Sequence, residues 1–162
     1  MKKIMESKES LGASTFCDLY GPINPSSNGG KQYFITFIDD CSRKTWVYFL
    51  QDKSEAFNAF KNFKTHVHNE VERTIKILHA DRGGEFCSKE FQDFCDEHGI
   101  QRHLTVAYTP QQNGISKRKN QTILNMVRCM LTHMSVPKNF WPEAVKWSIN
   151  VLNRNPTLLF IT

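Results

Sequence analysis

The sequence predicts an α/β fold in which a mixed five-stranded sheet carries helices on both faces. Several short segments are rich in aromatic and β-branched residues, which favour strands. Several longer segments repeat apolar residues at helical spacing. The predicted order is three strands, helix, strand, helix, strand, helix, helix, and the three opening strands are expected to be antiparallel. Strands that alternate with helices after an opening hairpin are typical of a sheet covered on both sides.

The opening strands are separated by segments dense in turn residues. A short strand is predicted at residues 15–19, and the glycine-, proline- and serine-rich residues 21–30 form a loop. Residues 32–38 and 45–50 are strands of aromatic and β-branched composition. The tight turn between them, at residues 39–42, makes them a hairpin.

Helices and strands alternate in the rest of the chain. Ser54 is expected to cap a helix that ends near residue 69, and Ser88 caps a shorter helix that Gly99 ends. Strands are predicted at residues 74–78 and 102–106. A long helix is expected at residues 115–134 and a last one at 140–152. The long helix carries an apolar stripe, which predicts its buried face: Ile123, Met126, Val127, Met130, Leu131 and Met134.

Length and composition indicate one globular domain. The chain has 162 residues, a net charge of +5 and a pI near 9.0, so its charge is compatible with a polyanionic partner. The domain is assigned to residues 11–157, with a disordered N-terminal end at 1–10 and a frayed C-terminal end at 158–162. Five cysteines without a C-x-x-C pair indicate free thiols in a reducing compartment. The sequence has no run of about 18 apolar residues, so no membrane span is expected. The free thiols are in keeping with an intracellular protein.

Two acidic residues are the candidates for chemistry. Asp18 lies near the end of the first predicted strand, and Asp81 directly follows the fourth. Acids at the ends of neighbouring strands can converge on a hard cation such as Mg²⁺, which prefers oxygen ligands. An aspartate at a strand end is also a common turn or capping residue, and spacing alone leaves that alternative open.

The motifs around these acids resemble the integrase core of copia-type retrotransposons, over residues 11–157. The segments that carry this resemblance occur in order and at matching spacing. They are Asp18-Leu-Tyr-Gly-Pro22, Tyr33-Phe-Ile-Thr-Phe-Ile-Asp-Asp-Cys-Ser-Arg43, Trp46-Val-Tyr48, Lys53-Ser-Glu-Ala-Phe57, Asp81-Arg-Gly-Gly-Glu-Phe86, Thr109-Pro-Gln-Gln-Asn-Gly-Ile-Ser116, Arg118-Lys-Asn120, Phe140-Trp141, Glu143-Ala-Val145 and Leu152-Asn-Arg-Asn-Pro-Thr157.

The resemblance implies a ribonuclease-H-like fold and a D,D-35-E catalytic triad. Members of this family process the 3′ ends of element DNA and join them to target DNA. Two Mg²⁺ or Mn²⁺ ions held by three carboxylates stabilise the attacking and leaving oxygens. Asp18 would be the first acid and bridge both metals, and Asp81 would be the second and hold one. The family also implies a homo-oligomer and a location in the nucleus or in a virus-like particle.

The third acid is missing from its expected position. Residues 82–116 separate Asp81 from position 117, where the family pattern has glutamate and this chain has Lys117. An ammonium group offers no acceptor and repels a cation, so metal binding is expected to be impaired and strand transfer lost. Glu85 is near Asp81 in sequence but is expected to point elsewhere. Asp39 and Asp40 are interpreted as carboxylates that cap a hairpin turn.

DNA contacts are expected from the loop and the helix that follow the last strand. The polar side chains of Gln111, Gln112 and Asn113 can donate to phosphates or base edges. Lys117, Arg118 and Lys119 make the start of the long helix basic. Cations there oppose the helix dipole, so a phosphate partner would explain them. A solvated basic face is the alternative. The glycines at 83 and 84 are expected to allow a tight turn.

Three functions are compatible with these motifs. The first is a polynucleotidyl transferase core, and the second is a non-catalytic nucleic-acid-binding or assembly module that keeps the fold. Lys117 favours the second for this chain. A ribonuclease acting on RNA–DNA hybrids shares the fold, but the Gln-Gln-Asn-Gly loop resembles integrases. The chain shows neither the zinc-binding domain nor the C-terminal extension of full-length family members, which is expected of an excised core or a truncated copy.

Overall fold

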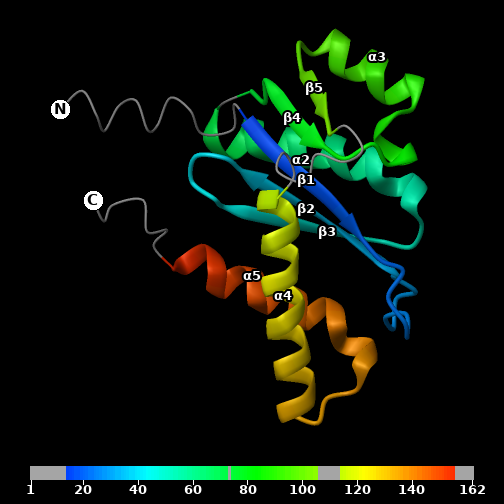
Figure 1. The fold of residues 1–162 in the computed structure, drawn as a ribbon, viewed down its shortest axis with the longest axis vertical. Helices are drawn as coiled ribbons and strands as arrows, with labels where there is room; N and C mark the ends of the chain where they lie inside the picture. The colour runs from blue at the N-terminus through cyan, green and yellow to red at the C-terminus, as the bar shows by residue number, and fades with distance from the viewer. Residues whose placement is uncertain (1–13, 73, 106–113, 156–162) are drawn as a thin grey trace, which may run out of the picture.

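A computed structural model of the chain describes residues 14–72, 74–105 and 114–155. Within them five strands form one sheet in the order β3-β2-β1-β4-β5 (Figure 1). β1, β2 and β3 are antiparallel neighbours, and β4 and β5 run parallel to β1. The mixed sheet with an antiparallel opening is therefore confirmed. The strands are β1 Ser14–Tyr20, β2 Tyr33–Asp39, β3 Thr45–Leu50, β4 Ile77–Ala80 and β5 Gln101–Leu104.

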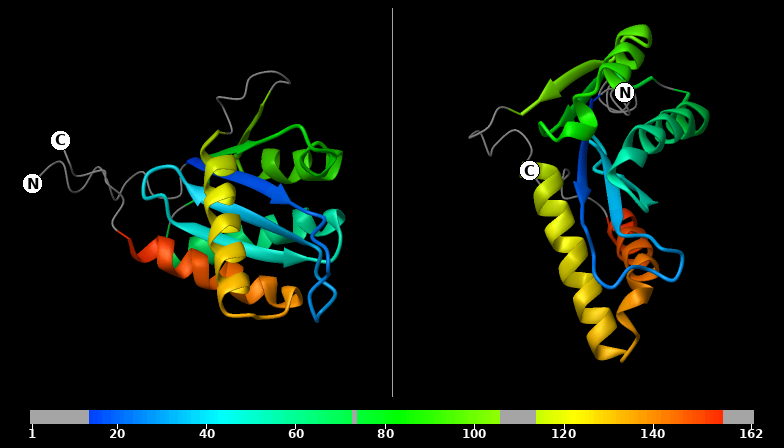
Figure 2. Two further views of the ribbon diagram at one scale, coloured as in Figure 1. Left: turned by 60° about the horizontal axis from the view of Figure 1, so that its bottom comes forward. Right: turned by 90° about the vertical axis from the view of Figure 1, so that its right-hand side faces the viewer.

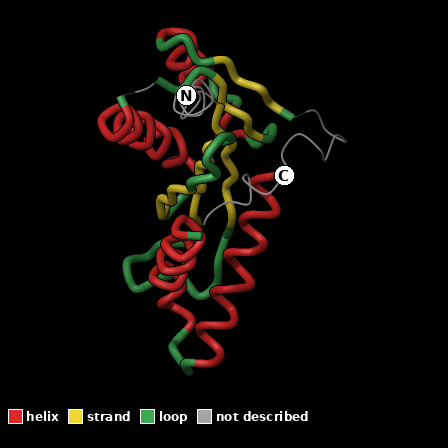
Figure 3. The backbone as a smooth tube through the Cα atoms, turned by 90° about the vertical axis from the view of Figure 1, so that its left-hand side faces the viewer, coloured by secondary structure: helices red, strands yellow, loops and turns green. Residues whose placement is uncertain are grey.

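Helices pack on both faces of this sheet. Figure 2 shows α2 and α4 on opposite sides, and Figure 3 shows the same separation from the other direction. The α-helices are α2 Ala56–Val71, α3 Lys89–Glu97, α4 Gly114–His133 and α5 Trp141–Arg154. Short 3₁₀ turns precede three of them, namely η1 Lys53–Glu55, η2 Gly84–Phe86 and η3 Lys138–Phe140. No helix in the described ranges is long and apolar enough to cross a membrane.

Alternation along the strands creates two hydrophobic cores. Phe37 of β2 stacks on Phe63 of α2 with ring centroids 4.3 Å apart, in the larger core shared with α3. Phe34, on the same strand but on the opposite face of the sheet, packs with Ile123 of α4 and Trp141 of α5 in a smaller core. Side chains two residues apart on a strand share a face. Asp18 of β1 is paired with Thr36 of β2, so both side chains lie on the face covered by α4.

Several local predictions hold and others need correction. Ser88 caps α3 by accepting a hydrogen bond from Phe91 N at 3.2 Å, as predicted. Ser54 does not cap the helix that ends near residue 69. It lies inside the 3₁₀ turn η1, which precedes α2 and is capped by Asp52, whose side chain accepts from Ser54 N at 2.8 Å. The fourth strand begins at Ile77 rather than residue 74, where pairing with β1 and β5 begins.

The predicted apolar stripe on the long helix is only partly buried. Ile123 and Val127 are buried, whereas Met134 lies beyond the end of α4 and is 72% exposed. The helix ends at His133, so Met134 does not extend the stripe. At the start of the helix the buried face continues through two polar residues, Ser116 and Asn120. The expected ends at 1–10 and 158–162 lie outside the described residues.

Candidate catalytic and nucleic-acid site

The two predicted acids lie next to each other on the sheet. Asp18 lies two residues before the end of β1 at Tyr20, so its predicted place near the end of the first strand is confirmed. Asp81 directly follows β4, as predicted. The parallel register pairs Phe16 with His79, and continuing it by two residues places Asp18 beside Asp81. Since alternate side chains share a face, both carboxyls point to the face that α4 covers.

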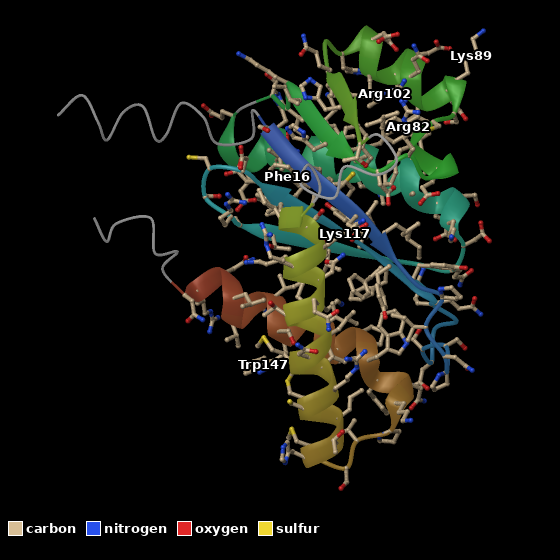
Figure 4. The ribbon with its side chains drawn as sticks, in the orientation of Figure 1. Phe16, Arg82, Lys89, Arg102, Lys117 and Trp147 are labelled. Carbon is tan, nitrogen blue, oxygen red and sulfur yellow. The ribbon has the colours of Figure 1, made fainter. Side chains whose placement is uncertain are left out.

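A buried hydrogen-bond bridge fixes α4 over Asp18. Asn120 is only 3% exposed, and its Nδ2 donates to Asp18 Oδ2 at 3.0 Å. Thr36 Oγ1 donates to Asn120 Oδ1 at 2.8 Å. One amide therefore ties the helix to β1 and β2 together. Lys117 lies one turn earlier on the same side of α4, and Figure 4 shows it at the start of the helix over the sheet.

Electrostatics couple the three side chains. Burial and, after it, the neighbouring charge of Asp81 raise the pKa of Asp18 from 3.8 to about 6. The hydrogen bond from Asn120 and the positive charge of Lys117 act in the opposite direction. A carboxyl with a raised pKa is stabilised by any cation that approaches it. Lys117 partly supplies that positive charge in this chain.

The turn after Asp81 is built around a glycine. Asp81 Oδ1 accepts a hydrogen bond from Gly83 N at 3.1 Å. The carboxylate of Glu85 folds back over Gly83, where an added Cβ would lie 2.7 Å from Glu85 Oε1. Gly83 has an ordinary φ of −59°, so the turn does not require a left-handed backbone at this position, and a larger side chain here would displace only the flexible carboxylate of Glu85.

The acids of the β2–β3 hairpin serve its turn. Asp39 Oδ2 accepts from Ser42 N at 2.7 Å and from Ser42 Oγ at 2.8 Å. Asp40 pairs with Arg43 at 3.6 Å, and Arg43 has a φ of 60°. These contacts confirm the interpretation of both carboxylates as turn residues.

The basic start of α4 faces two environments. Lys117 and Arg118 are exposed, whereas Lys119 is partly buried. Burial lowers the pKa of Lys119, and the nearby charge of Arg43 lowers it further. The three other predicted DNA contacts, Gln111, Gln112 and Asn113, lie outside the described residues.

The donor set suits one hard cation better than two. In the described ranges no three histidine, cysteine, aspartate or glutamate side chains form a group that could hold a metal ion. Asp18 and Asp81 present adjacent carboxylates, which would be the residues to hold a single Mg²⁺. The third position offers an ammonium group, so the residues present do not fit a second ion.

Comparisons with known proteins identify the family. Residues 12–110 match the model described as integrase core domain. This chain belongs to that family. It is 46% identical to the retrovirus-related Pol polyprotein from transposon TNT 1-94 of Nicotiana tabacum. The 143 aligned residues are 88% of this chain and 11% of that protein. It is 38% identical over 128 residues to the corresponding polyprotein from transposon RE2 of Arabidopsis thaliana, covering 79% of the chain and 9% of that protein.

Solved structures support the fold of this integrase core. A chain of the simian T-cell lymphotropic virus intasome in complex with PP2A regulatory subunit B56 gamma matches with a TM-score of 0.72 and 16% identity, covering 93% of this chain and 51% of that one. The HTLV-2 integrase catalytic core domain in complex with magnesium, in its dimeric form, matches with a TM-score of 0.66 and 18% identity, covering 94% and 93%. The fold is therefore ribonuclease-H-like.

One site residue had no assigned role in the sequence. Asn120 belongs to a motif that supports the family resemblance, yet only the structure shows its contact with Asp18. The sequence did contain a hint of this role, because Asn120 lies three residues before Ile123 and so on the apolar side of α4. A buried polar residue on such a stripe normally has a hydrogen-bond partner.

Proposed function

We propose that this chain is a DNA-binding integrase core that keeps the fold and the nucleic-acid surface but has lost the chemistry of strand transfer. The family reaction is integration of element DNA, by 3′-end processing and strand transfer with two metal ions. The observation that carries the proposal is the charge at position 117. Lys117 acts on Asp18 from the turn of α4 that precedes the Asn120 bridge.

The loss of chemistry follows from electrostatics. Asp18 and Asp81 would hold one Mg²⁺ or Mn²⁺ ion, which supplies polarisation of a phosphate oxygen when bound. A unit positive charge about 4 Å from a divalent ion is repelled by several kcal/mol at an effective dielectric near 20. Lys117 also supplies part of the positive charge that a metal would bring to Asp18. A second ion therefore lacks both a ligand and a favourable potential.

DNA binding is proposed to persist without this chemistry. Lys117, Arg118 and Lys119 carry positive charge at the helix start, where Gln111, Gln112 and Asn113 precede them in sequence. Phosphate contacts of this kind position DNA and need no metal. The partners are element ends and target DNA, in the nucleus or a virus-like particle. The dimeric form of the HTLV-2 core supports a homo-oligomer here, and so a role in assembly.

The test compares the chain with two variants at one position. Lys117→Glu supplies the missing carboxylate, and Lys117→Gln removes the charge without supplying one. Calorimetric titration with Mg²⁺ and Mn²⁺ is expected to show tighter binding in Lys117→Glu, and a metal-dependent strand-transfer assay is expected to show activity there alone. Equal metal affinity and comparable activity in the parent chain and Lys117→Glu would contradict the proposal.

A further inference from the structure

A pocket of about 360 Å³ lies beside α4, away from the two acids. Its walls come from the end of β1, the loop after it, the lower half of α4, and the segment from η3 into α5. Tyr20 and Leu124 contribute apolar surface, and Arg128 and Lys138 contribute positive charge. No acidic side chain lines it, and neither cation forms an ion pair with another described residue.

This lining suits a ligand with an aromatic ring and an anionic group. Tyr20 is 36% exposed, and its ring packs against Phe34 with ring centroids 5.4 Å apart. An exposed aromatic face stacks on nucleic-acid bases with little regard to their identity. Arg128 and Lys138 can pair with a phosphate, and arginine does so with two parallel hydrogen bonds.

The pocket also lies on a path that begins at the acidic site. Tyr20 is two residues beyond Asp18, so both side chains project from the same face of β1. Arg128 is 11 residues beyond Lys117, which is close to three helical turns, so both lie on the same side of α4. At 1.5 Å per residue they are roughly 16 Å apart along the axis. Figure 1 shows β1 passing the start of α4 and both elements continuing toward the lower part of the molecule.

We infer that this pocket binds one unstacked nucleotide of a single-stranded DNA segment, with the base against Tyr20 and a phosphate on Arg128 and Lys138. The inference rests on the proposed function, because the strand that enters the pocket is the one that passes the basic start of α4. It adds a second contact, which lies beyond the acids toward the far end of α4. That contact does not depend on a metal ion or on the residue at position 117.

A built-in reporter makes the pocket testable. Trp141 lines the pocket, and its buried indole N–H has no hydrogen-bond acceptor among the described residues. In a spectrum of the chain labelled with ¹⁵N-tryptophan, thymidine 5′-monophosphate is expected to shift the Trp141 indole signal saturably. Thymidine and inorganic phosphate, each alone, should give weaker binding, and the signals of Trp46 and Trp147 should stay unchanged. An unchanged Trp141 signal, or equal affinity for inorganic phosphate, would overturn the inference.

Anisotropy with two labelled octanucleotides separates this inference from the proposed function. One is oligothymidine, and the other has the same backbone without bases. Tyr20→Leu is expected to weaken binding of oligothymidine about tenfold and leave the abasic strand unchanged. Arg128→Gln should weaken both, while Arg154→Gln, which removes an arginine outside the pocket, should weaken neither. If the unaltered chain binds neither strand, the DNA-binding function is wrong; if it binds and both pocket variants bind equally well, only the pocket assignment is wrong.

Discussion

Asn120 joins three parts of the molecule through one amide group. Its oxygen accepts from Thr36, which is fully buried, and its nitrogen donates to Asp18. A buried hydroxyl that loses its acceptor costs the free energy of its desolvation. The position of α4 relative to the two acids therefore depends on a residue that performs no chemistry itself.

Asn120→Leu is predicted to lower the free energy of unfolding by about 2–3 kcal/mol, because Thr36 and Asp18 both lose a partner. The pKa of Asp18 should also rise above its value of about 6, since the Asn120 hydrogen bond lowers it. Urea unfolding measures the first effect and NMR titration the second. Asn125→Leu, an exposed position on the same helix, is the matched control. Equal costs for the two variants would contradict the structural role.

Asp18→Asn is predicted to stabilise the fold at pH 8 and not at pH 3.5. Folding raises the pKa of Asp18 from 3.8 to about 6, so the charged form disfavours the folded state. That cost is absent below the unfolded pKa, appears as pH rises from about 4 to 6, and is complete above it. A neutral amide avoids it, with a gain of about 2 kcal/mol in metal-free buffer. Thermal unfolding at both pH values checks this, and an equal change at both would be inconsistent with it.

At the scale of elements, a single side chain holds the last helix to an edge strand. Asn153 in the final turn of α5 accepts from Thr45 N at 2.9 Å and donates to Thr45 O at 2.8 Å. The amide thus takes the place of a neighbouring strand at the start of β3. Edge strands with unpaired backbone groups are prone to association, so this contact also protects the edge.

Asn153→Ala is predicted to destabilise the chain by about 1–2 kcal/mol and to speed hydrogen exchange at the Thr45 amide. Asn150→Ala, one turn earlier on the exposed side of α5, serves as control and should change neither quantity. Hydrogen exchange followed by NMR gives the residue-level answer. Unaltered exchange at Thr45 in Asn153→Ala would show that the contact is not maintained in solution.

The sequence predicted the element types well because hydrophobic periodicity reflects burial directly. It located Asp81 correctly, since a strand end is marked by the glycines that follow. It also placed Asp18 near the end of β1, which runs one residue beyond the predicted end. Asn120 received no role, because its partners Thr36 and Asp18 are 84 and 102 residues away in sequence.

At the scale of the whole molecule, one sheet separates a large aromatic core from a smaller one. Phe37 belongs to the first and contacts the rings of Tyr48, Phe60 and Phe63. Phe34 belongs to the second, with Trp141 and the inner face of α4. The helix that carries position 117 thus depends on the smaller core, while most of the sheet depends on the larger one.

Phe37→Ala is predicted to lower the free energy of unfolding by about 3–5 kcal/mol, because it empties a fully buried position between α2 and the sheet. Phe140→Ala, at a phenylalanine that is 39% exposed, should cost much less. Urea denaturation of both variants gives the comparison. A loss of under about 1 kcal/mol for Phe37→Ala would mean that the larger core is not packed as described.

The bridge from Asn120 has an evolutionary consequence. Because Asn120 fixes α4 over Asp18 without using the side chain at position 117, the proposed loss of strand transfer involves one side chain and leaves the position of the helix unchanged. Every lysine codon becomes a glutamate codon by one change at its first base. On the proposed function, restoring a carboxylate at position 117 would therefore take a single base change and no further substitution in the helix.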